Sequence, residues 1–207
     1  MTDEAAVARF EAFVHHQEPG AQWTPVTDYS LGGRRAAEGQ HPELIRDVLH
    51  PKTVLDYGCG YGYLISFLRE LSIDAEGYDP NGSAFRQYAP ANARPHISGA
   101  LWNTHRSDLV ICREVLEHCT VYEAVQVVRR LVTLSTRLIY VTTRFAKAPD
   151  HLLSVETEFD VDPTHITCLT KPFLRTLFVL EGCRSRPDLE EKMDWQRKGR
   201  VLVFEVA

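Results

Sequence analysis

The sequence lacks an apolar run approaching the about 18 residues of a membrane-spanning helix, and its first residues lack the basic and apolar regions of a signal peptide. It has no basic tract either, and its net charge is −5. This charge weakens a nucleic-acid-binding interpretation. The five cysteines form no C-x-x-C pair and are odd in number, which indicates reduced thiols. We therefore expect a cytoplasmic protein that does not enter a membrane.

The composition is that of an ordinary globular domain, with 44% hydrophobic and 25% charged residues in a chain of 207. This length suffices for one α/β domain with a real core. We predict a single domain over 1–207, in which 1–50 form an N-terminal helical cap and 51–207 form the core. The segment 145–165 has little regular pattern and is interpreted as a lid, because long irregular loops often cover binding sites. Both a monomer and a homodimer are compatible with the sequence.

From residue 53 onward, short apolar runs alternate with segments that have apolar residues at helical spacing. The runs predict strands at 53–56, 74–78, 95–98, 108–112 and 136–143. The other segments predict helices at 62–71, 82–88, 115–132 and 171–180. Such alternation is typical of a parallel, doubly wound sheet with helices on both faces. The apolar segment 200–206 follows a polar stretch without a long helical crossover, so it predicts a final antiparallel strand.

Three glycines at alternate positions follow the first predicted strand. Asp56 ends that strand, and Gly58, Gly60 and Gly62 lie between it and the helix that begins near Tyr63. A strand, a glycine turn and a helix N-terminus can together hold a nucleotide-like ligand. The G-x-G-x-G spacing differs from the G-x-G-x-x-G pattern of dinucleotide-binding proteins, which disfavours a nicotinamide-dependent oxidoreductase. A tight turn without a ligand is the alternative.

A carboxylate also follows the second predicted strand, in Gly77-Tyr78-Asp79-Pro80-Asn81. Parallel strands end at the same edge of a sheet, so Asp79 is expected beside the glycine turn. There it can accept hydrogen bonds from both ribose hydroxyls of a nucleoside. The alternative is that Asp79 caps the helix that follows it.

The stretches 54–62 (VLDYGCGYG), 77–81 (GYDPN) and 108–118 (DLVICREVLEH) resemble, in this order, the motifs of class I S-adenosylmethionine (SAM)-dependent methyltransferases. The resemblance implies a Rossmann-like, seven-stranded sheet with the order 3-2-1-4-5-7-6 and an antiparallel strand 7. It implies SAM as the cofactor, with the glycine turn facing the methionine part and Asp79 holding the ribose. By the same resemblance Asp56 orders the turn or the methionine amino group.

Carried over residue by residue, the resemblance implies a set of cofactor-binding residues: Asp56, Gly58, Cys59, Gly60, Gly62, Tyr63, Asp79, Pro80, Leu101, Cys112 and Arg113. One departure from the family pattern lies after the third predicted strand. Many relatives carry an acidic residue there that contacts adenine, whereas the segment 98–102 (SGALW) has no carboxylate. Backbone groups and the flanks of Ala100 and Leu101 are expected to hold the adenine instead.

Glu114, Glu117 and His118 are spaced i, i+3 and i+4, so a helix would place them on one face near the methyl donor. Two oxygens and a nitrogen could hold Mg²⁺ or Mn²⁺. The pattern Glu-x-x-Glu-His with a later histidine resembles the metal site of small-RNA 3′-terminal 2′-O-methyltransferases, and ubiquinone-pathway O-methyltransferases have a similar stretch. This resemblance implies Glu114, Glu117, His118 and His165 as metal ligands.

The alternative is that these acidic residues merely suit a helix N-terminus and bind no metal. In that case His118 or His165 is the general base, because an imidazole titrates near neutral pH. The predicted catalytic residues are His118, Glu114 and His165.

Three functions are compatible with these patterns. We expect a methyltransferase that acts on a small-molecule acceptor, at an oxygen atom. A small acceptor is favoured over RNA because the acidic segment 145–165 would repel a polyphosphate chain. Methylation of an RNA 3′ end is the alternative within enzymes. A SAM-binding accessory subunit without turnover is the non-enzymatic alternative, and the acid–base cluster at 114–118 argues against it.

Overall fold

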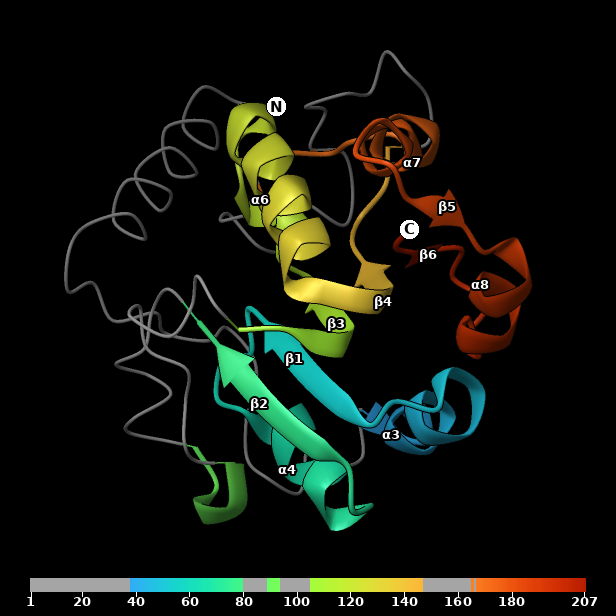
Figure 1. Cartoon of the computed structure of the whole chain (residues 1–207). Helices are drawn as coiled ribbons and strands as arrows, with labels where there is room; N and C mark the ends of the chain where they lie inside the picture. Colours follow the sequence, from blue (N-terminus) through green and yellow to red (C-terminus); the bar gives the residue numbers. More distant parts are fainter. Residues whose placement is uncertain (1–37, 80–88, 94–104, 147–164, 166) are drawn as a thin grey trace, which may run out of the picture.

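The computed structural model describes residues 38–79, 89–93, 105–146, 165 and 167–207 (Figure 1). Within these residues six strands form one sheet: β1 (Thr53–Tyr57), β2 (Asp74–Tyr78), β3 (Ser107–Arg113), β4 (Ser135–Thr142), β5 (Arg184–Ser185) and β6 (Val201–Glu205). The longer helices are α3 (His41–Leu44), which continues as the π-helix η1 (Ile45–Leu49), α4 (Tyr63–Glu70), α6 (Val121–Leu134), α7 (Lys171–Leu180) and α8 (Pro187–Met193). Two short 3₁₀ turns are η2 (Ala91–Ala93) and η3 (Leu116–His118).

The strand order is β2-β1-β3-β4-β6-β5. The strands β2, β1, β3 and β4 pair in parallel, whereas β6 is antiparallel to both β4 and β5. This confirms the α/β, Rossmann-like class and the antiparallel final strand. The predicted third strand at 95–98 and the predicted helix at 82–88 lie outside the described residues. The seven-stranded sheet therefore stays a prediction, with which the order of these six strands is compatible.

Side chains alternate between two helical layers along each central strand. On β3, Leu109 and Ile111 join the core beneath α3, α4 and α8, whereas Val110 and Cys112 join the core beneath α6 and α7 (Figure 1). All four are fully buried, as expected for strands covered on both faces. The sheet is thus the middle layer of three, and its strand ends are where polar side chains can gather.

The first described helix runs from the carboxyl end of β4 toward the amino end of β1. His41, at its start, contacts Tyr140 near the carboxyl end of β4, and η1 ends three residues before β1 begins. The cap predicted for 1–50 is described only from residue 38. Most of the predicted lid also lies outside the described residues, since 147–164 are among those not described. In the described part of the chain, no helix combines the length and the apolarity needed to cross a membrane.

Two parts of the fold differ from the sequence-based prediction. The helix predicted from residue 115 begins at Val121, because Thr120 caps it: its hydroxyl accepts from Glu123 N at 3.2 Å, and the Glu123 carboxylate accepts from Thr120 N at 2.7 Å. Strand β5 and helix α8 are additional elements before β6. Helix α8 has only seven residues, most of them polar, so its sequence carried little helical signal.

Candidate active site

The glycine turn lies at the carboxyl end of β1 and is tied to the end of β2. The N–H groups of Gly58 and Cys59 both donate to the carbonyl of Tyr78, at 2.7 and 3.1 Å. Gly58 has a φ of 82°, and a Cβ atom there would lie 2.3 Å from Cγ2 of Val115. Only glycine fits this position. Gly60 also has a positive φ, of 52°, but no atom of the described residues lies within 4 Å of where its Cβ atom would stand. Within the described residues, the turn is therefore closed at Gly58 and open at Gly60.

Two carboxylates lie close to the turn. Asp79 Oδ2 accepts a hydrogen bond from Gly60 N at 2.8 Å, so the residue after β2 is joined to the turn after β1. Asp56, at the end of β1, is 5% exposed. Burial, together with the charges of Asp56 and Asp79, raises the pKa of the Cys59 thiol well above its ordinary value. Cys59 therefore lines the turn as a neutral thiol and is not a nucleophile.

The second half of the site is the turn after β3. Glu114 has a φ of 51°, which is unusual for a non-glycine residue. The end of β4 holds it there: Glu114 N donates to the Thr142 carbonyl at 2.9 Å, and the Thr142 hydroxyl donates to Glu114 Oε1 at 3.0 Å. Arg144 Nε donates to Glu114 Oε2 at 3.2 Å. The backbone therefore turns sharply at Glu114, and Val115 packs on the glycine turn.

Glu117 is the most deeply buried acidic residue of this turn, with no exposed surface. Its Oε2 accepts from the Thr143 hydroxyl at 2.7 Å, whereas no donor among the described residues lies within hydrogen-bond distance of its Oε1. Burial, and then the charge of Glu114, raise the pKa of Glu117 well above its ordinary value. Burial and the neighbouring negative charge therefore favour the protonated form of Glu117.

The pKa of Glu114 is shifted in the opposite direction to that of Glu117. Burial alone would raise it, but the hydrogen bond with Glu117, the charge of Arg144 and the bond from Thr142 bring it below its ordinary value. A carboxylate of Glu114 beside a protonated Glu117 forms an acid–carboxylate pair, in which the protonated oxygen of Glu117 donates to Glu114.

Two histidines complete the cluster. The rings of His118 and His165 lie edge to face, with centroids 4.8 Å apart. One ligand atom from each of Glu117, His118 and His165 lies within 4.8 Å of the others. The segment around His165 is tied to this turn, because Thr167 N donates to the carbonyl of Glu117 at 3.1 Å.

Three of the four predicted metal ligands thus converge, but not for the predicted reason. They do not share the face of a regular helix, since Leu116–His118 form a 3₁₀ turn and α6 begins only at Val121. Glu114 lies outside the converging group, and its carboxylate is held by Thr142 and Arg144.

The remaining predicted cofactor residues are distributed as follows. Tyr63 opens α4 beside the turn, and Cys112 is fully buried in the core beneath α6. Arg113 donates to both oxygens of Glu38. Pro80 and Leu101 lie outside the described residues.

Sequence reasoning missed the contribution of Thr142 and Thr143. Both hydroxyls donate to the acidic pair from the end of β4. Their position was the available signal, because polar residues directly after an apolar parallel strand lie at the edge where such folds bind ligands.

Residues 34–183 match a family described as a methyltransferase domain. No curated protein matches the chain. Among solved structures, magnesium protoporphyrin IX methyltransferase from Synechocystis with bound SAH (the demethylated product of SAM) is 20% identical, with a TM-score of 0.58 over 99% of this chain and 100% of that one. A methyltransferase of calicheamicin biosynthesis is 16% identical, with a TM-score of 0.59 over 100% of this chain and 70% of that one.

An O-methyltransferase family protein from Burkholderia thailandensis is 12% identical, with a TM-score of 0.56 over 84% of this chain. This chain spans only 57% of that protein's length. At these identities the likeness of the solved structures concerns the fold alone.

Proposed function

The chain belongs to the SAM-dependent methyltransferases, and from that premise we propose that it methylates an oxygen atom of a small-molecule acceptor. The observation that carries the proposal is the contact between Gly58 and Val115. It joins the glycine turn to the segment that bears Glu117 and His118. A cofactor held over the turn and an acceptor held by the cluster would therefore be neighbours.

The residues around the glycine turn fit SAM. No atom of the described residues lies where a side chain of Gly60 would stand, and the Gly60 N–H holds the Asp79 carboxylate beside the turn. We assign Asp79 to the ribose hydroxyls and Asp56 to the methionine amino group. When bound, SAM supplies a methyl group that its positive sulfonium has already activated. The chain's own task is to align the acceptor and to remove a proton from it.

We propose that the histidine pair accepts this proton. A neutral imidazole accepts a proton near pH 7, and His118 and His165 are the imidazoles of the cluster. The acid–carboxylate pair behind them keeps one negative charge next to the rings, which stabilises an imidazolium once it forms. A hydroxyl acceptor placed against either ring would thus lose its proton as the methyl group is transferred.

A divalent metal is the alternative occupant of the cluster, in which case the two histidines are its ligands and not the proton acceptors. Two imidazoles and a carboxylate converge, and the Glu117 Oε1 lacks a donor among the residues described. We propose Glu117, His118 and His165 as its ligands. Such a metal would lower the pKa of an acceptor hydroxyl. Because imidazole suits transition metals better than Mg²⁺, this donor set favours Mn²⁺ over Mg²⁺.

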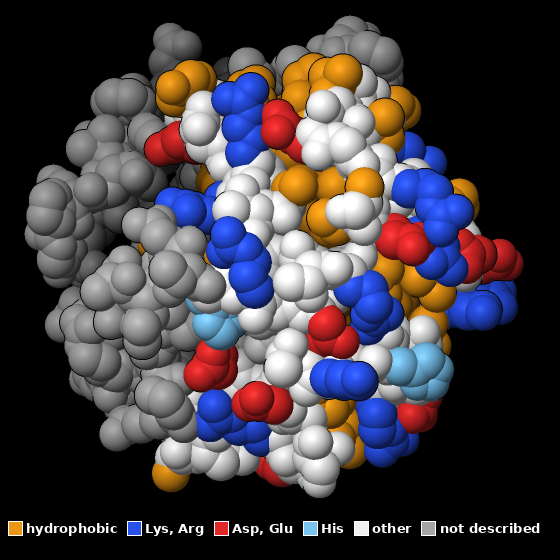
Figure 2. Space-filling view, in the orientation of Figure 1, with side chains coloured by type: hydrophobic (Ala, Val, Ile, Leu, Met, Phe, Trp, Pro, Cys, Tyr) orange, Lys and Arg blue, Asp and Glu red, His pale blue; other side chains and the backbone are white. Residues whose placement is uncertain are grey.

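The acceptor is proposed to be small because of charge as well as fold. On the face seen in Figure 2, basic and acidic side chains are interspersed over the described residues, without a continuous basic patch. The net charge of the chain is −5. A polyanion such as RNA would meet little electrostatic attraction here.

Calorimetry with Mn²⁺ on the wild-type protein, on Glu117→Ala and on Glu191→Gln tests the metal. Glu191 is an exposed carboxylate on α8 and serves as the matched control. We expect one saturable site in the wild type and in the control, and none in Glu117→Ala. Weak binding that is equal in all three would remove the metal from the proposal.

The acceptor is tested by measuring SAH formation with panels of phenols, alcohols, amines and RNA 3′ ends. We expect turnover with hydroxyl compounds, with a loss of at least tenfold in Glu117→Ala. Turnover only with amines would contradict methylation at oxygen. Turnover with RNA that periodate oxidation of its 3′ end abolishes would assign the RNA alternative instead.

A further inference from the structure

Thr143, the residue directly after β4, is buried beside the cluster of Glu117, His118 and His165, and the proposed reaction gives it no part. It is 2% exposed, and its hydroxyl donates to Glu117 Oε2 at 2.7 Å. Glu117 itself has no exposed surface. Because bulk water reaches neither partner, solvent does not compete for this hydrogen bond. The Thr143 hydroxyl is therefore a firm contact of the Glu117 carboxyl group.

The backbone around Glu117 is held by other contacts. Thr167 N donates to the carbonyl of Glu117 at 3.1 Å, which fastens the segment of His165 to this turn. His118 N donates to the carbonyl of Val115 at 3.1 Å. These contacts leave the orientation of the Glu117 carboxyl group undetermined. The last torsion of a glutamate side chain has only broad preferences, so hydrogen bonds must set it.

Two neighbours can set this orientation, and they differ in how lasting their contact is. Glu114 shares a hydrogen bond with Glu117. Two carboxyl groups keep such a contact only while they share a proton. The Thr143 hydroxyl, in contrast, can donate to Glu117 whether that residue is ionised or protonated. Thr143 is therefore the constant contact, and Oε1 is the oxygen of Glu117 to which no described residue donates.

We infer that Thr143 is a positioning residue for the proposed reaction. Its hydroxyl keeps Oε2 of Glu117 on the side of β4, so that the carboxyl group meets His118 and His165 in one fixed orientation. Either use of the cluster needs this orientation, whether it stabilises an imidazolium or binds Mn²⁺. Groups that orient a ligating or charge-stabilising side chain contribute to affinity and activity without touching metal or substrate. The inference rests on the proposed function of Glu117 in this cluster.

Substitution of Thr143 by valine and by serine tests the role of the hydroxyl. Valine has nearly the shape of threonine but no donor, whereas serine keeps the donor. Calorimetry with Mn²⁺ and SAH formation with the best hydroxyl acceptor are measured for both variants. We expect Thr143→Val to weaken Mn²⁺ binding and to lower kcat by roughly tenfold or more. The KM for SAM should change little, because the donor is held over the glycine turn. Thr143→Ser should stay within about threefold of the wild type.

Thr133→Val is the matched control. Thr133 is exposed near the end of α6, and its hydroxyl donates to the carbonyl of Arg129 at 2.9 Å. It lies two residues before the amino end of β4, whereas the cluster is at the carboxyl end. The same loss of a hydroxyl there should leave Mn²⁺ affinity and kcat within about twofold of the wild type. A purely structural role of Thr143 would lower the Tm of Thr143→Val but leave both quantities of the folded protein unchanged.

The outcomes separate this inference from the proposed function. Equal Mn²⁺ affinity or equal kcat in the wild type and Thr143→Val overturns the inference, and so does a Thr143→Ser variant as impaired as Thr143→Val. If the wild type has no Mn²⁺ site, the metal is removed from the proposal and kcat alone decides the role of Thr143. A wild type that neither binds Mn²⁺ nor forms SAH contradicts the proposed function itself.

Crystal structures of the wild type and Thr143→Val decide the inference in that last case. We expect the Glu117 carboxyl group to turn away from its wild-type orientation in Thr143→Val, and an unchanged orientation overturns the inference. If Thr143→Val does not fold, Thr143→Cys takes its place, because a thiol is only a weak donor. Its Mn²⁺ affinity and kcat should also fall, and wild-type values in this variant overturn the inference.

Discussion

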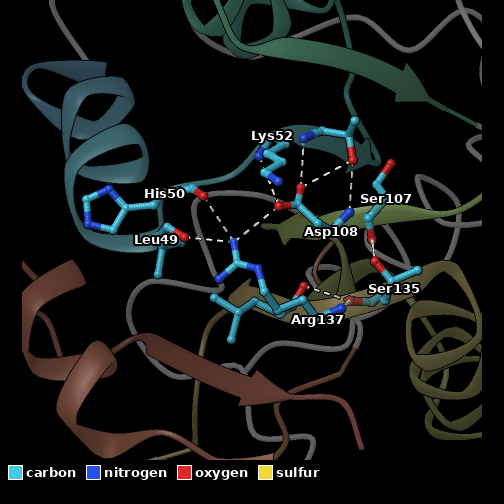
Figure 3. A network of polar contacts seen from close by, with 10 residues as sticks. Leu49, His50, Lys52, Ser107, Asp108, Ser135 and Arg137 are labelled. Atoms are coloured by element: carbon cyan, nitrogen blue, oxygen red, sulfur yellow. Dashed lines mark hydrogen bonds and ion pairs between the residues drawn. The ribbon is translucent and has the colours of Figure 1, made fainter.

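The two ends of strand β3 both carry acidic residues, but their carboxylates have opposite surroundings. At the amino end, Asp108 Oδ1 accepts from the N–H of Thr53 at 2.7 Å, and Oδ2 accepts from the N–H of Lys52 at 2.9 Å (Figure 3). Arg137 approaches Oδ2 at 3.3 Å and also donates to the carbonyl of Leu49 at 2.8 Å. Both oxygens of Asp108 are satisfied, and they join β1, β3, β4 and the end of η1.

At the carboxyl end, Glu117 is more deeply buried and yet has one oxygen without a donor among the described residues. The pKa values of Asp108 and Glu117 are also shifted in opposite directions. Burial would raise the pKa of Asp108, but the backbone N–H groups of Lys52 and Thr53 and the charge of Arg137 bring it below its ordinary value. Burial and the charge of Glu114 raise that of Glu117. A carboxylate that stabilises the fold is fully bonded, whereas one that is under-bonded destabilises it and is retained for another purpose.

The largest effect is expected for a substitution of Glu117, which tests whether this residue has a functional or a structural role. Glu117→Gln keeps the volume of the side chain but removes its ability to ionise, so we expect turnover to fall roughly a hundredfold or more. Its Tm should stay equal to that of the wild type or rise, because the ionisable buried group is gone. Activity assays and thermal unfolding of the same preparation check both. A lowered Tm with full activity would assign Glu117 to the structural class of Asp108.

The second prediction concerns the contact that joins the two halves of the site. Gly58→Ala forces a methyl group to within 2.3 Å of Val115 at a φ of 82°, so we expect a loss of about 2–4 kcal/mol of unfolding free energy. Gly60→Ala is the matched control, since its Cβ meets nothing, and it should cost only about 1 kcal/mol. Urea unfolding measures both. Equal losses would mean that Val115 moves freely, and the proposed coupling between cofactor and cluster would fail.

The third prediction is that the two ends respond to pH with opposite signs. The folded-state pKa of Asp108 is lowered, so its contribution to stability is present above its unfolded value of about 3.9 and is lost as the pH falls through the lower folded value. The folded-state pKa of Glu117 is raised, so the folded protein binds more protons and becomes less stable as the pH rises above about 4.3.

Unfolding free energies of Asp108→Asn and Glu117→Gln between pH 3 and 8 check these signs. Asp108→Asn should lose about 1–2 kcal/mol relative to the wild type at neutral pH, and this difference should shrink in acid. Glu117→Gln should gain on the wild type as the pH rises. A parallel pH dependence of the two differences would contradict the assigned protonation states.

Local patterns predicted most of the fold because each element carries its own signal. The helix at Lys171–Leu180 was predicted with both ends correct, since Thr170 caps it and its apolar residues are periodic. The order of the six described strands agrees with the resemblance to the methyltransferase family. The short α8 was missed because most of its seven residues are polar.

The site was predicted less completely because its geometry depends on contacts distant in sequence. Glu38 and Arg113 are 75 residues apart, and no local pattern pairs them. The convergence of Glu117, His118 and His165 depends on the left-handed backbone of Glu114, which Thr142 and Arg144 stabilise from another strand. The residue types pointed to the chemistry, whereas the conformation that assembles them is tertiary.

The smallest predicted effect lies at the structural end. Arg137 contacts Asp108 and also donates to the carbonyls of Leu49 and His50, which end the π-helix η1. Its side chain is 40% exposed, so water and salt screen much of its charge. Arg137→Lys keeps the charge but loses the planar guanidinium that serves several acceptors at once. We expect a loss of less than about 1 kcal/mol of unfolding free energy.

This loss should be larger at low salt, and SAH affinity should not change, because Asp108 and Glu117 lie at opposite ends of the strand and its connected turn. Urea unfolding at two salt concentrations and calorimetry with SAH measure the two quantities. A clear change in SAH affinity would show that the amino end of β3 is coupled to the site. The division of the strand into a structural end and a functional end would then be wrong.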